Sequence, residues 1–360
     1  MSRTVPALLR AQPDSQVQAI MGQVMLALIP ATAFGLFLFG LPAVFLFAVT
    51  VLAALGFEAM CLSLAGKPVK STLLDGSAVL TGWLLAMTLP PWAPWWIGVV
   101  GSGLAIVIGK QVFGGLGQNI FNPAMLARVA LLVSFPLEMT TWANVAPPLS
   151  DGARGLFDSL AITFGASPVP DGMTGATMIG HIKTEFSQGH GLEHAYSAGD
   201  YDVVKSFLGW SRGSLGEKSS VLLLLGGLWM LRRKLITWHI PVSMLLTVSV
   251  LAGIFAFVDG DRYPGPLFHL FSGALMLGAF FIATDYVTSP SSQVGQLIFG
   301  AGCGLIVFVI RTWGGYPEGV GFAVLLMNAM TPTIDHYVRP RIYGRDRKGR
   351  PLDLPAGNDG

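Results

Sequence analysis

The segment Pro42–Leu64 has the sequence PAVFLFAVTVLAALGFEAMCLSL, in which Glu58 is the only charged residue. A helix needs about 20 mostly apolar residues to cross the hydrocarbon core of a bilayer, and this segment is long enough. The whole chain shares its character: 52% of the 360 residues are hydrophobic and 12% are charged, about half the charged fraction of soluble domains. So few charges cannot cover a water-facing surface. A net charge of +2 also gives no reason to expect nucleic acid as a partner.

Apolar runs of similar character recur on both sides of a polar middle segment. We therefore predict an all-α polytopic membrane protein with about ten transmembrane helices. Four parts are expected: a first membrane unit (1–139), an external segment (140–218), a second membrane unit (219–338) and a basic tail (339–360). The predicted spans are Ala19–Phe39, Pro42–Leu64, Leu73–Leu89, Trp95–Phe113, Asn122–Leu137, Ser219–Leu231, Trp238–Phe257, Pro266–Ala283, Gln293–Ile310 and Val320–Tyr337.

Lysine and arginine residues near the span ends predict the orientation of these helices, because short cytoplasmic loops are enriched in them. With the N-terminus inside, the opposite side receives the uncharged turn Pro90–Pro94 and the acidic Asp259-Gly260-Asp261. Both termini are then cytoplasmic and segment 140–218 lies outside. The cytoplasmic side receives Arg3, Arg10, Lys67, Lys70, Lys110, Arg232, Arg233, Lys234 and the basic residues of the tail.

The two halves of the chain match each other span for span. The matched pairs are Thr81-Gly82 with Ser272-Gly273, Pro90-Pro91 with Ser289-Pro290, Lys110…Gly115 with Arg311…Gly315, and Asn122-Pro-Ala-Met125 with Asn328-Ala-Met330. Five spans in each copy is an odd number, so the second copy must be inverted in the membrane. Inverted repeats usually enclose a pathway at their interface near the midplane.

The external segment contains a motif suited to phosphate attachment, DGMTGAT. Its residues of interest are Asp171, Thr174, Gly175, Ala176 and Thr177. Thr177 supplies a hydroxyl nucleophile, and the small residues before it let main-chain N–H groups approach a phosphate. The apolar Met178-Ile179 that follows could begin a helix, whose N-terminus favours a dianion. The alternative interpretation is an ordinary glycine and threonine turn.

The motif D-x-x-[ST]-G-A-T resembles the flavinylation motif of Rnf-type and Na⁺-pumping NADH:quinone reductase complexes. Leu80–Pro91, Gly114–Met125 and Ala283-Thr284-Asp285 are similar to signatures of the D subunit of the Rnf complex and the related B subunit of the quinone-reducing complex. The resemblance covers nearly the whole chain. It favours the D subunit, because the B subunit generally has an extended N-terminal region. A passive transporter with inverted repeats is a further alternative.

The resemblance implies the function, cofactors and partners. FMN would be joined through its phosphate to Thr177, and riboflavin could be held without a covalent bond. The chain would have no catalytic residues and no metal of its own. It would carry electrons, coupled to Na⁺ or H⁺ translocation, as a multi-pass subunit in a bacterial inner membrane. Its partners would be membrane lipid, subunits of the A, B, C, E and G types, and an enzyme that transfers FMN from FAD.

Ionisable residues inside spans are costly unless paired or hydrated, so they are functional candidates. Glu58, Asp75, Lys110, Arg128 and Asp285 are all predicted to lie toward the cytoplasmic side. One interpretation pairs Glu58 with Arg128. The other makes Asp285, Glu58 and Asp75 part of an ion or proton pathway. A further ionisable residue, His269 of the eighth span, is interpreted as a packing residue.

Three other patterns are interpreted as structural. His190-Gly-Leu-Glu193-His194 fits a zinc peptidase pattern, but it is glycine-flanked and is predicted to be a solvated loop. Gly115-x-Gly117 lacks the third glycine of a dinucleotide fingerprint. The two cysteines, Cys61 and Cys303, lie singly in apolar runs and are predicted to be small core residues.

Overall fold

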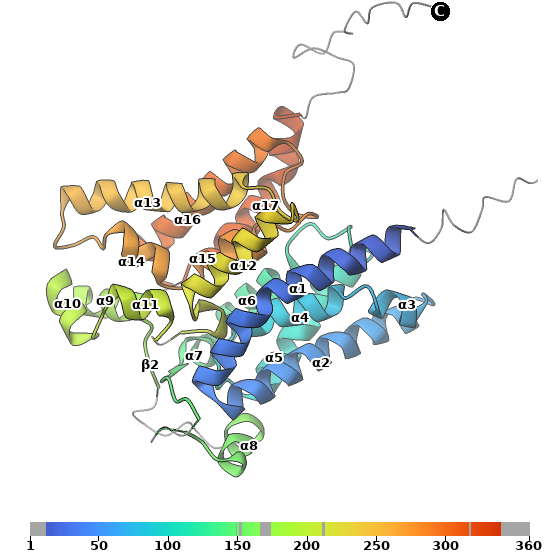
Figure 1. Cartoon of the computed structure of the whole chain (residues 1–360), viewed down its shortest axis with the longest axis horizontal. Helices are drawn as coiled ribbons and strands as arrows, with labels where there is room; N and C mark the ends of the chain where they lie inside the picture. Colours follow the sequence, from blue (N-terminus) through green and yellow to red (C-terminus); the bar gives the residue numbers. More distant parts are fainter. Residues whose placement is uncertain are drawn as a thin grey trace, which may run out of the picture.

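A computed structural model describes residues 12–148, 150, 153–165, 174–210, 213–316 and 318–339. Within these residues the chain is mostly helical, with one two-stranded sheet (Figure 1). The helices of the first half are α1 (Gln12–Phe39), α2 (Leu41–Leu64), α3 (Val69–Leu73), α4 (Ser77–Thr88), α5 (Trp95–Gly103), the π-helical η2 (Leu104–Gln111), α6 (Pro123–Ser134) and α7 (Pro136–Thr140). Those of the second half are α12 (Ser220–Arg232), α13 (His239–Val258), α14 (Pro266–Phe271), α15 (Leu275–Leu277), the π-helical η4 (Gly278–Ile282), α16 (Gln293–Trp313) and α17 (Val320–Tyr337).

Four helices are long and apolar enough to cross a membrane. They are Gln16–Phe39 of α1, α2, α13 and α16. Three shorter apolar helices, α4, α6 and α12, have 12, 12 and 13 residues. At 1.5 Å per residue each extends for about 20 Å or less, which is short of the hydrocarbon thickness of about 30 Å. The predicted count of ten spans therefore stays a prediction.

The third and eighth predicted spans are wrong as continuous helices, and a glycine explains each break. Gly76, with φ +79°, separates α3 from α4 within the predicted span Leu73–Leu89. Gly273, with φ +70°, lies between α14 and α15 within Pro266–Ala283. A left-handed backbone cannot continue a right-handed helix, and glycine adopts it without a steric penalty.

Most of the buried apolar side chains in the described residues form one large cluster shared by both halves. In it α13 packs along α16 and α2 packs against α4 and α5, while α6 meets α17 and α1 meets α12 across the halves. In Figure 1 the helices α1–α5 and the helices α12–α17 accordingly form two neighbouring groups. The core therefore holds the halves together.

The middle segment packs on one end of the helical assembly. It contains β1 (Trp142–Ala143), α8 (Leu156–Phe164), β2 (Thr174–Gly175), α9 (Met178–Ser187), α10 (Leu192–Ala198), α11 (Val203–Leu208) and the 3-10 turn η3 (Leu215–Glu217). The helices α9 and α10 share a small apolar cluster with Phe268 of α14. β1 and β2 pair antiparallel, with Trp142 opposite Gly175.

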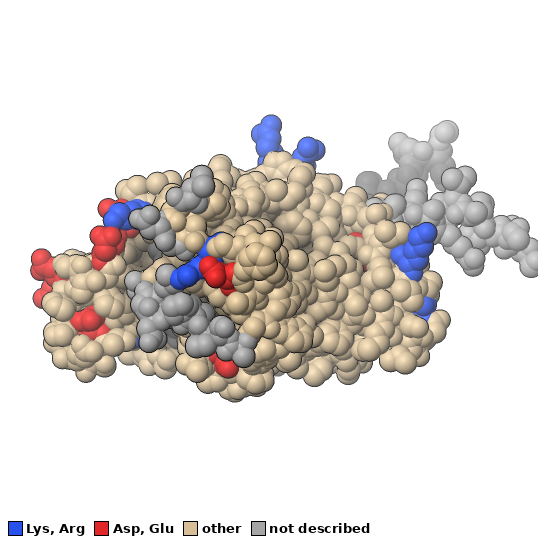
Figure 2. All heavy atoms as spheres, turned by 90° about the horizontal axis from the view of Figure 1, so that it is seen from below, with Lys and Arg blue, Asp and Glu red and all other residues tan. Residues whose placement is uncertain are grey.

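Charged side chains are sparse over the face drawn in Figure 2. Most of the acidic side chains visible there lie toward the left end, where Figure 1 places α9 and α10. Basic side chains mark the opposite end, where α3 lies. A large tan area lies between these ends, and large apolar side chains are exposed along α1, α2, α13 and α16.

Candidate functional site

The motif threonine lies at the start of a helix. Thr177 is the N-cap residue of α9, with φ −63° and ψ 161°, and its Oγ1 accepts a hydrogen bond of 3.3 Å from the N–H of Gly180. Its carbonyl oxygen accepts a hydrogen bond of 2.8 Å from the N–H of His181. The expected helix after the motif is thus confirmed. Thr174 and Gly175 form β2, and Asp171 lies outside the described residues.

A cavity of about 370 Å³ adjoins this helix start. Ala176 and Met178, which flank Thr177 in the chain, line it together with His181, Tyr201 and Trp210. The ring of Tyr201 stacks on that of Tyr196 with centroids 4.7 Å apart. Burial raises the pKa of Tyr201 to about 12, so its hydroxyl is neutral at physiological pH.

These residues fit a covalently bound flavin phosphate. The first N–H groups of α9 have no intrahelical acceptor and face the position of the Thr177 hydroxyl, where a phosphate would be stabilised. The neighbouring cavity offers aromatic rings for an isoalloxazine and polar groups for a ribityl chain. Thr177 is 4% exposed, so a bound group would have to extend into the cavity rather than directly into solvent.

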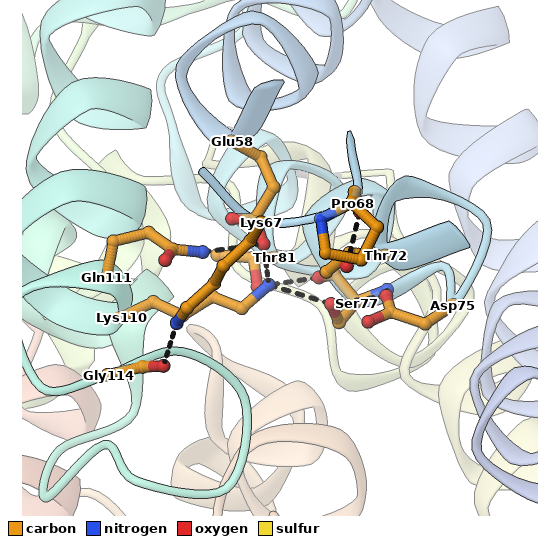
Figure 3. A network of polar contacts seen from close by, with 10 residues as sticks. All are labelled: Glu58, Lys67, Pro68, Thr72, Asp75, Ser77, Thr81, Lys110, Gln111 and Gly114. Carbon is orange, nitrogen blue, oxygen red and sulfur yellow. Dashed lines mark hydrogen bonds and ion pairs between the residues drawn. The ribbon is translucent and has the colours of Figure 1, made fainter. Parts of the chain in front are cut away.

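A second cluster lies within the first half of the helical assembly (Figure 3). Lys110 of η2 lies 2.8 Å from Oε1 of Glu58 on α2, with exposed side-chain fractions of 2% and 1%. The same ammonium donates to Oγ of Ser77 at 2.7 Å, and this hydroxyl donates to Oδ1 of Asp75 at 2.5 Å. Gln111 Nε2 also donates to Glu58 Oε1 at 2.8 Å. Three of the predicted ionisable residues therefore form one connected network.

Asp285 lines the same cavity as Ser77 and Lys110 of this network. Its Oδ2 accepts hydrogen bonds from Asn122 Nδ2 at 3.4 Å and from Thr288 Oγ1 at 3.3 Å. Lys110, Asn122 and Asp285 all line one cavity of about 90 Å³, whose walls come from both halves of the chain. The structure thus brings Glu58, Asp75 and Asp285 into one neighbourhood.

The predicted pairing of Glu58 with Arg128 is wrong. Lys110 occupies the position beside Glu58, whereas the guanidinium of Arg128 lies over the ring of Trp142 at 6.0 Å from its centroid. Trp142 belongs to β1, which pairs with the motif strand. The direction of the Arg128 side chain on α6 could not be read from sequence spacing, because it depends on how α6 packs.

The second half contains a buried cation that was predicted only as a repeat match. Arg311 of α16 donates from Nη1 to the carbonyl of His269 at 2.6 Å and from Nη2 to the carbonyl of Ser272 at 2.8 Å. Its Nη2 lies 3.4 Å from Oε1 of Glu318. The position that matches Lys110 therefore also holds a buried cation beside a carboxylate. Lys110 contacts the third predicted span through Ser77, and Arg311 contacts the eighth, which is the repeat counterpart of the third, through Ser272. That match was the available sequence signal for Arg311, whereas Glu318 lies outside the matched segment.

Lys183 of α9 was not predicted to have a role. Its ammonium donates to the carbonyls of Ile310, Gly314 and Tyr316 at 2.9, 2.7 and 2.7 Å. Burial lowers its pKa to about 8, partly offset by the nearby charge of Glu318. Lys183 thus attaches the motif helix to the C-terminal end of α16, where a helix favours positive charge.

The remaining sequence patterns have mixed outcomes. His190 and His194 are exposed as expected, but the predicted loop is wrong from Leu192 onward, because Glu193 and His194 lie in α10 and both histidine rings contact Glu185 of α9. Gly115 and Gly117 lie after η2 with φ +110° and +87°. Cys303 is buried, and Cys61 is partly buried.

Comparison with known proteins places the chain in a family. The model of the NQR2, RnfD, RnfE family matches residues 10–344. The chain belongs to this family. A protein of Stutzerimonas stutzeri, named as the D subunit of an ion-translocating oxidoreductase complex, is 57% identical over 338 residues, which cover 94% of this chain and 95% of the relative. Proteins with the same name from Halorhodospira halophila and Rhodobacter capsulatus are 53% and 49% identical, covering 92% and 82% of the chain and 93% and 81% of the relatives.

Membership of the NQR2, RnfD, RnfE family agrees with the helices described above. Four of them are long and apolar enough to span a bilayer, and they expose large apolar side chains such as Leu52, Leu246 and Phe257. A lipid environment accounts for such exposure, which water would make unfavourable. The chain is a multi-pass membrane protein.

Proposed function

We propose that the chain is the D subunit of an ion-translocating oxidoreductase complex and carries FMN on Thr177. The observation that carries this proposal is the position of Thr177, a motif hydroxyl at the N-terminus of α9 beside a cavity lined by aromatic and polar groups. Bound FMN would supply a centre that accepts and releases electrons. The chain itself would hold the phosphate, orient the flavin and place it next to partner subunits.

Attachment requires a balanced group transfer. Oγ1 of Thr177 forms a bond to the FMN phosphorus of FAD, the P–O bond to the AMP moiety breaks, and AMP leaves. The hydroxyl proton passes to a base of the transferase that catalyses the step. The N–H groups at the start of α9 would hold the phosphate of attached FMN, because a helix N-terminus favours an anion.

The proposed topology places segment 140–218 on the periplasmic side of a bacterial inner membrane and both termini in the cytoplasm. Lys67, Lys70 and Arg232–Lys234 would then be cytoplasmic. The acidic loop Asp259–Asp261 and the flavin segment would be external. Electrons would enter and leave through subunits of the A, B, C, E and G types, and riboflavin is a second candidate cofactor without a covalent bond.

The proposed ion pathway lies between two inverted repeats. Two observations support this arrangement: Lys110 and Arg311 occupy matching positions and each lies beside a carboxylate, and the backbone N–H of Asn122 donates to its own match, Asn328. Oε2 of Glu58 is buried and accepts no hydrogen bond within the described part of the chain. We propose that this oxygen and the Asp285 carboxylate bind Na⁺ or a proton during transfer.

Mass spectrometry of the tryptic peptide that contains Thr177 tests the flavin proposal. Cleavage after Arg154 and Lys183 isolates the motif in one peptide. The complex should be purified from cells that contain the transferase. The expected peptide carries the mass of FMN minus one water, with fragment ions that place the addition on Thr177. An unmodified peptide would instead favour a transporter that uses no flavin, and a modification on Thr174 would move the site.

A further inference from the structure

The outer end of the motif helix gathers three histidines around one carboxylate. Glu185, in the last turn of α9, has Oε2 at 2.7 Å from Nδ1 of His190 and at 3.2 Å from Nδ1 of His194. The two imidazole rings lie with centroids 4.3 Å apart. His181, one turn earlier on α9, has Nε2 at 3.9 Å from Oε1 of the same carboxylate. Half of the six histidines of the chain thus surround Glu185.

The chain reversal after α9 holds this cluster in place. Gly189 adopts φ +85°, its N–H donates to the carbonyl of Phe186, and the N–H of His190 donates to the carbonyl of Glu185 at 3.0 Å. This pattern is a Schellman cap, which places the second residue after the helix end beside the third residue before it. The juxtaposition of Glu185 and His190 therefore follows from backbone structure and not from a chance side-chain rotamer.

The imidazoles of the cluster lie at the protein surface. The exposed side-chain fractions are 13% for Glu185, 44% for His190 and 57% for His194, so solutes can reach the imidazoles. Asp259 and Asp261 line the same cavity as His190, and so do Lys183, Arg262 and Arg311.

We propose that Glu185, His190 and His194 form a binding site for a first-row transition-metal dication, with Zn²⁺ the best match. Two imidazoles and one carboxylate are a common zinc donor set, and the fourth position belongs to water or to His181. All three ligand atoms lie within 4.8 Å of one another. In a tetrahedral site they would be about 3.3 Å apart, so binding requires only small side-chain movements.

The proposed metal would join α9 to α10. Glu185 lies eight residues after Thr177, which corresponds to about 12 Å along the helix. The site is thus separate from the flavin attachment point, although it lies on the same helix. A metal there would stiffen the helical pair that carries the flavin, and it would do so without taking part in electron transfer.

Zinc binding by the intact complex tests the proposal. The complex, purified with a histidine-free tag and stripped with a chelator, would be titrated with Zn²⁺ alone and its bound zinc counted after gel filtration. The double variant His190→Ala/His194→Ala should bind one zinc fewer per chain than wild type. Glu185→Gln should weaken the same site at least tenfold, because a neutral amide replaces a charged ligand.

Two controls keep the result specific. His336→Ala removes an exposed histidine at the end of α17 and should leave the zinc count unchanged. In-gel flavin fluorescence should persist in every variant, which separates loss of the metal site from loss of flavin attachment or folding. Equal zinc counts and affinities in wild type and the double variant would overturn the metal site and leave a surface hydrogen-bonded cluster.

Discussion

The backbone N–H of Asn122 donates a hydrogen bond of 3.0 Å to Oδ1 of Asn328, and both side chains are almost completely buried. Asn122 also caps α6 by accepting from the N–H of Met125 at 3.2 Å. Asn328 in turn donates from Nδ2 to the carbonyl of Thr288 at 3.1 Å. One amide side chain of α17 thus connects the start of α6 to the segment that follows η4.

Replacing Asn328 by Leu should weaken the contact between the halves. The substitution removes the acceptor of the buried Asn122 N–H, which costs about 1–3 kcal/mol for an unsatisfied group, whereas the carbonyl of Thr288 keeps its hydrogen bond from Thr331. Thermal unfolding in detergent measures the loss. Met330→Ala, at a 48% exposed position of the same helix, is the control and should change stability little. Equal effects of the two substitutions would contradict the role of Asn328.

Substitutions at Thr177 should separate helix capping from flavin attachment. Asn is a good N-cap residue but has no hydroxyl, Ser supplies both features, and Ala supplies neither. In-gel fluorescence should therefore be kept in Thr177→Ser and lost in Thr177→Asn and Thr177→Ala. Only Thr177→Ala should also destabilise α9, by about 1 kcal/mol. A fluorescent Thr177→Asn or Thr177→Ala protein would show that the flavin is attached elsewhere.

Cysteine labelling should place the two ends of the helical assembly on opposite sides of the membrane. In a background without Cys61 and Cys303, an impermeant thiol reagent should label Ser187→Cys in cells with a permeabilised outer membrane. Ser71→Cys should be labelled only after the inner membrane is opened. Both serines are exposed, so access to the side chain does not differ. The reverse labelling pattern would invert the proposed topology.

Replacing Lys110 alone should destabilise the protein more than replacing both Lys110 and Glu58, which form a buried ion pair. Lys110→Met leaves the Glu58 carboxylate buried without its cation, which typically costs about 3–5 kcal/mol. The double variant Lys110→Met/Glu58→Leu should recover part of that loss, since no buried charge remains. Recovery of the assembled complex after heating measures both. If the double variant is no more stable than Lys110→Met, the two residues do not interact as the structure indicates.

Asp285→Asn should impair ion translocation more than flavin attachment. The amide can keep the contact with Asn122 but cannot exchange a proton or neutralise Na⁺. Assembly and flavin fluorescence should be measured first, and ion transport and electron transfer then compared in vesicles. Ser289→Ala, four residues further along the chain, is a control without loss of charge. Wild-type transport by an assembled Asp285→Asn complex would show that Asp285 does not carry the ion, and Glu58 or Asp75 would then be the better candidate.

Local patterns in the sequence predicted much of the helical architecture and the motif. The runs at Pro42–Leu64 and Gln293–Ile310 became α2 and α16, because a continuous apolar run of that length has few alternatives to a buried or lipid-facing helix. The helix after Thr177 was predicted for a similar reason, since small residues followed by apolar ones favour a helix start. The broken spans at Gly76 and Gly273 were missed, because a glycine interrupts a helix only where packing requires a left-handed backbone.

Side-chain partners depended on tertiary packing. The sequence by itself determined that Glu58, Lys110 and Arg128 lie in apolar surroundings and therefore need partners. Only the packing of α2 against η2 decided that Glu58 meets Lys110, while Arg128 lies against Trp142. The Schellman reversal likewise brought His190 and His194 onto Glu185 instead of Glu193. Hydropathy is a property of local segments, whereas ion pairs and ligand sets depend on distances between segments that are fixed only when the helices pack.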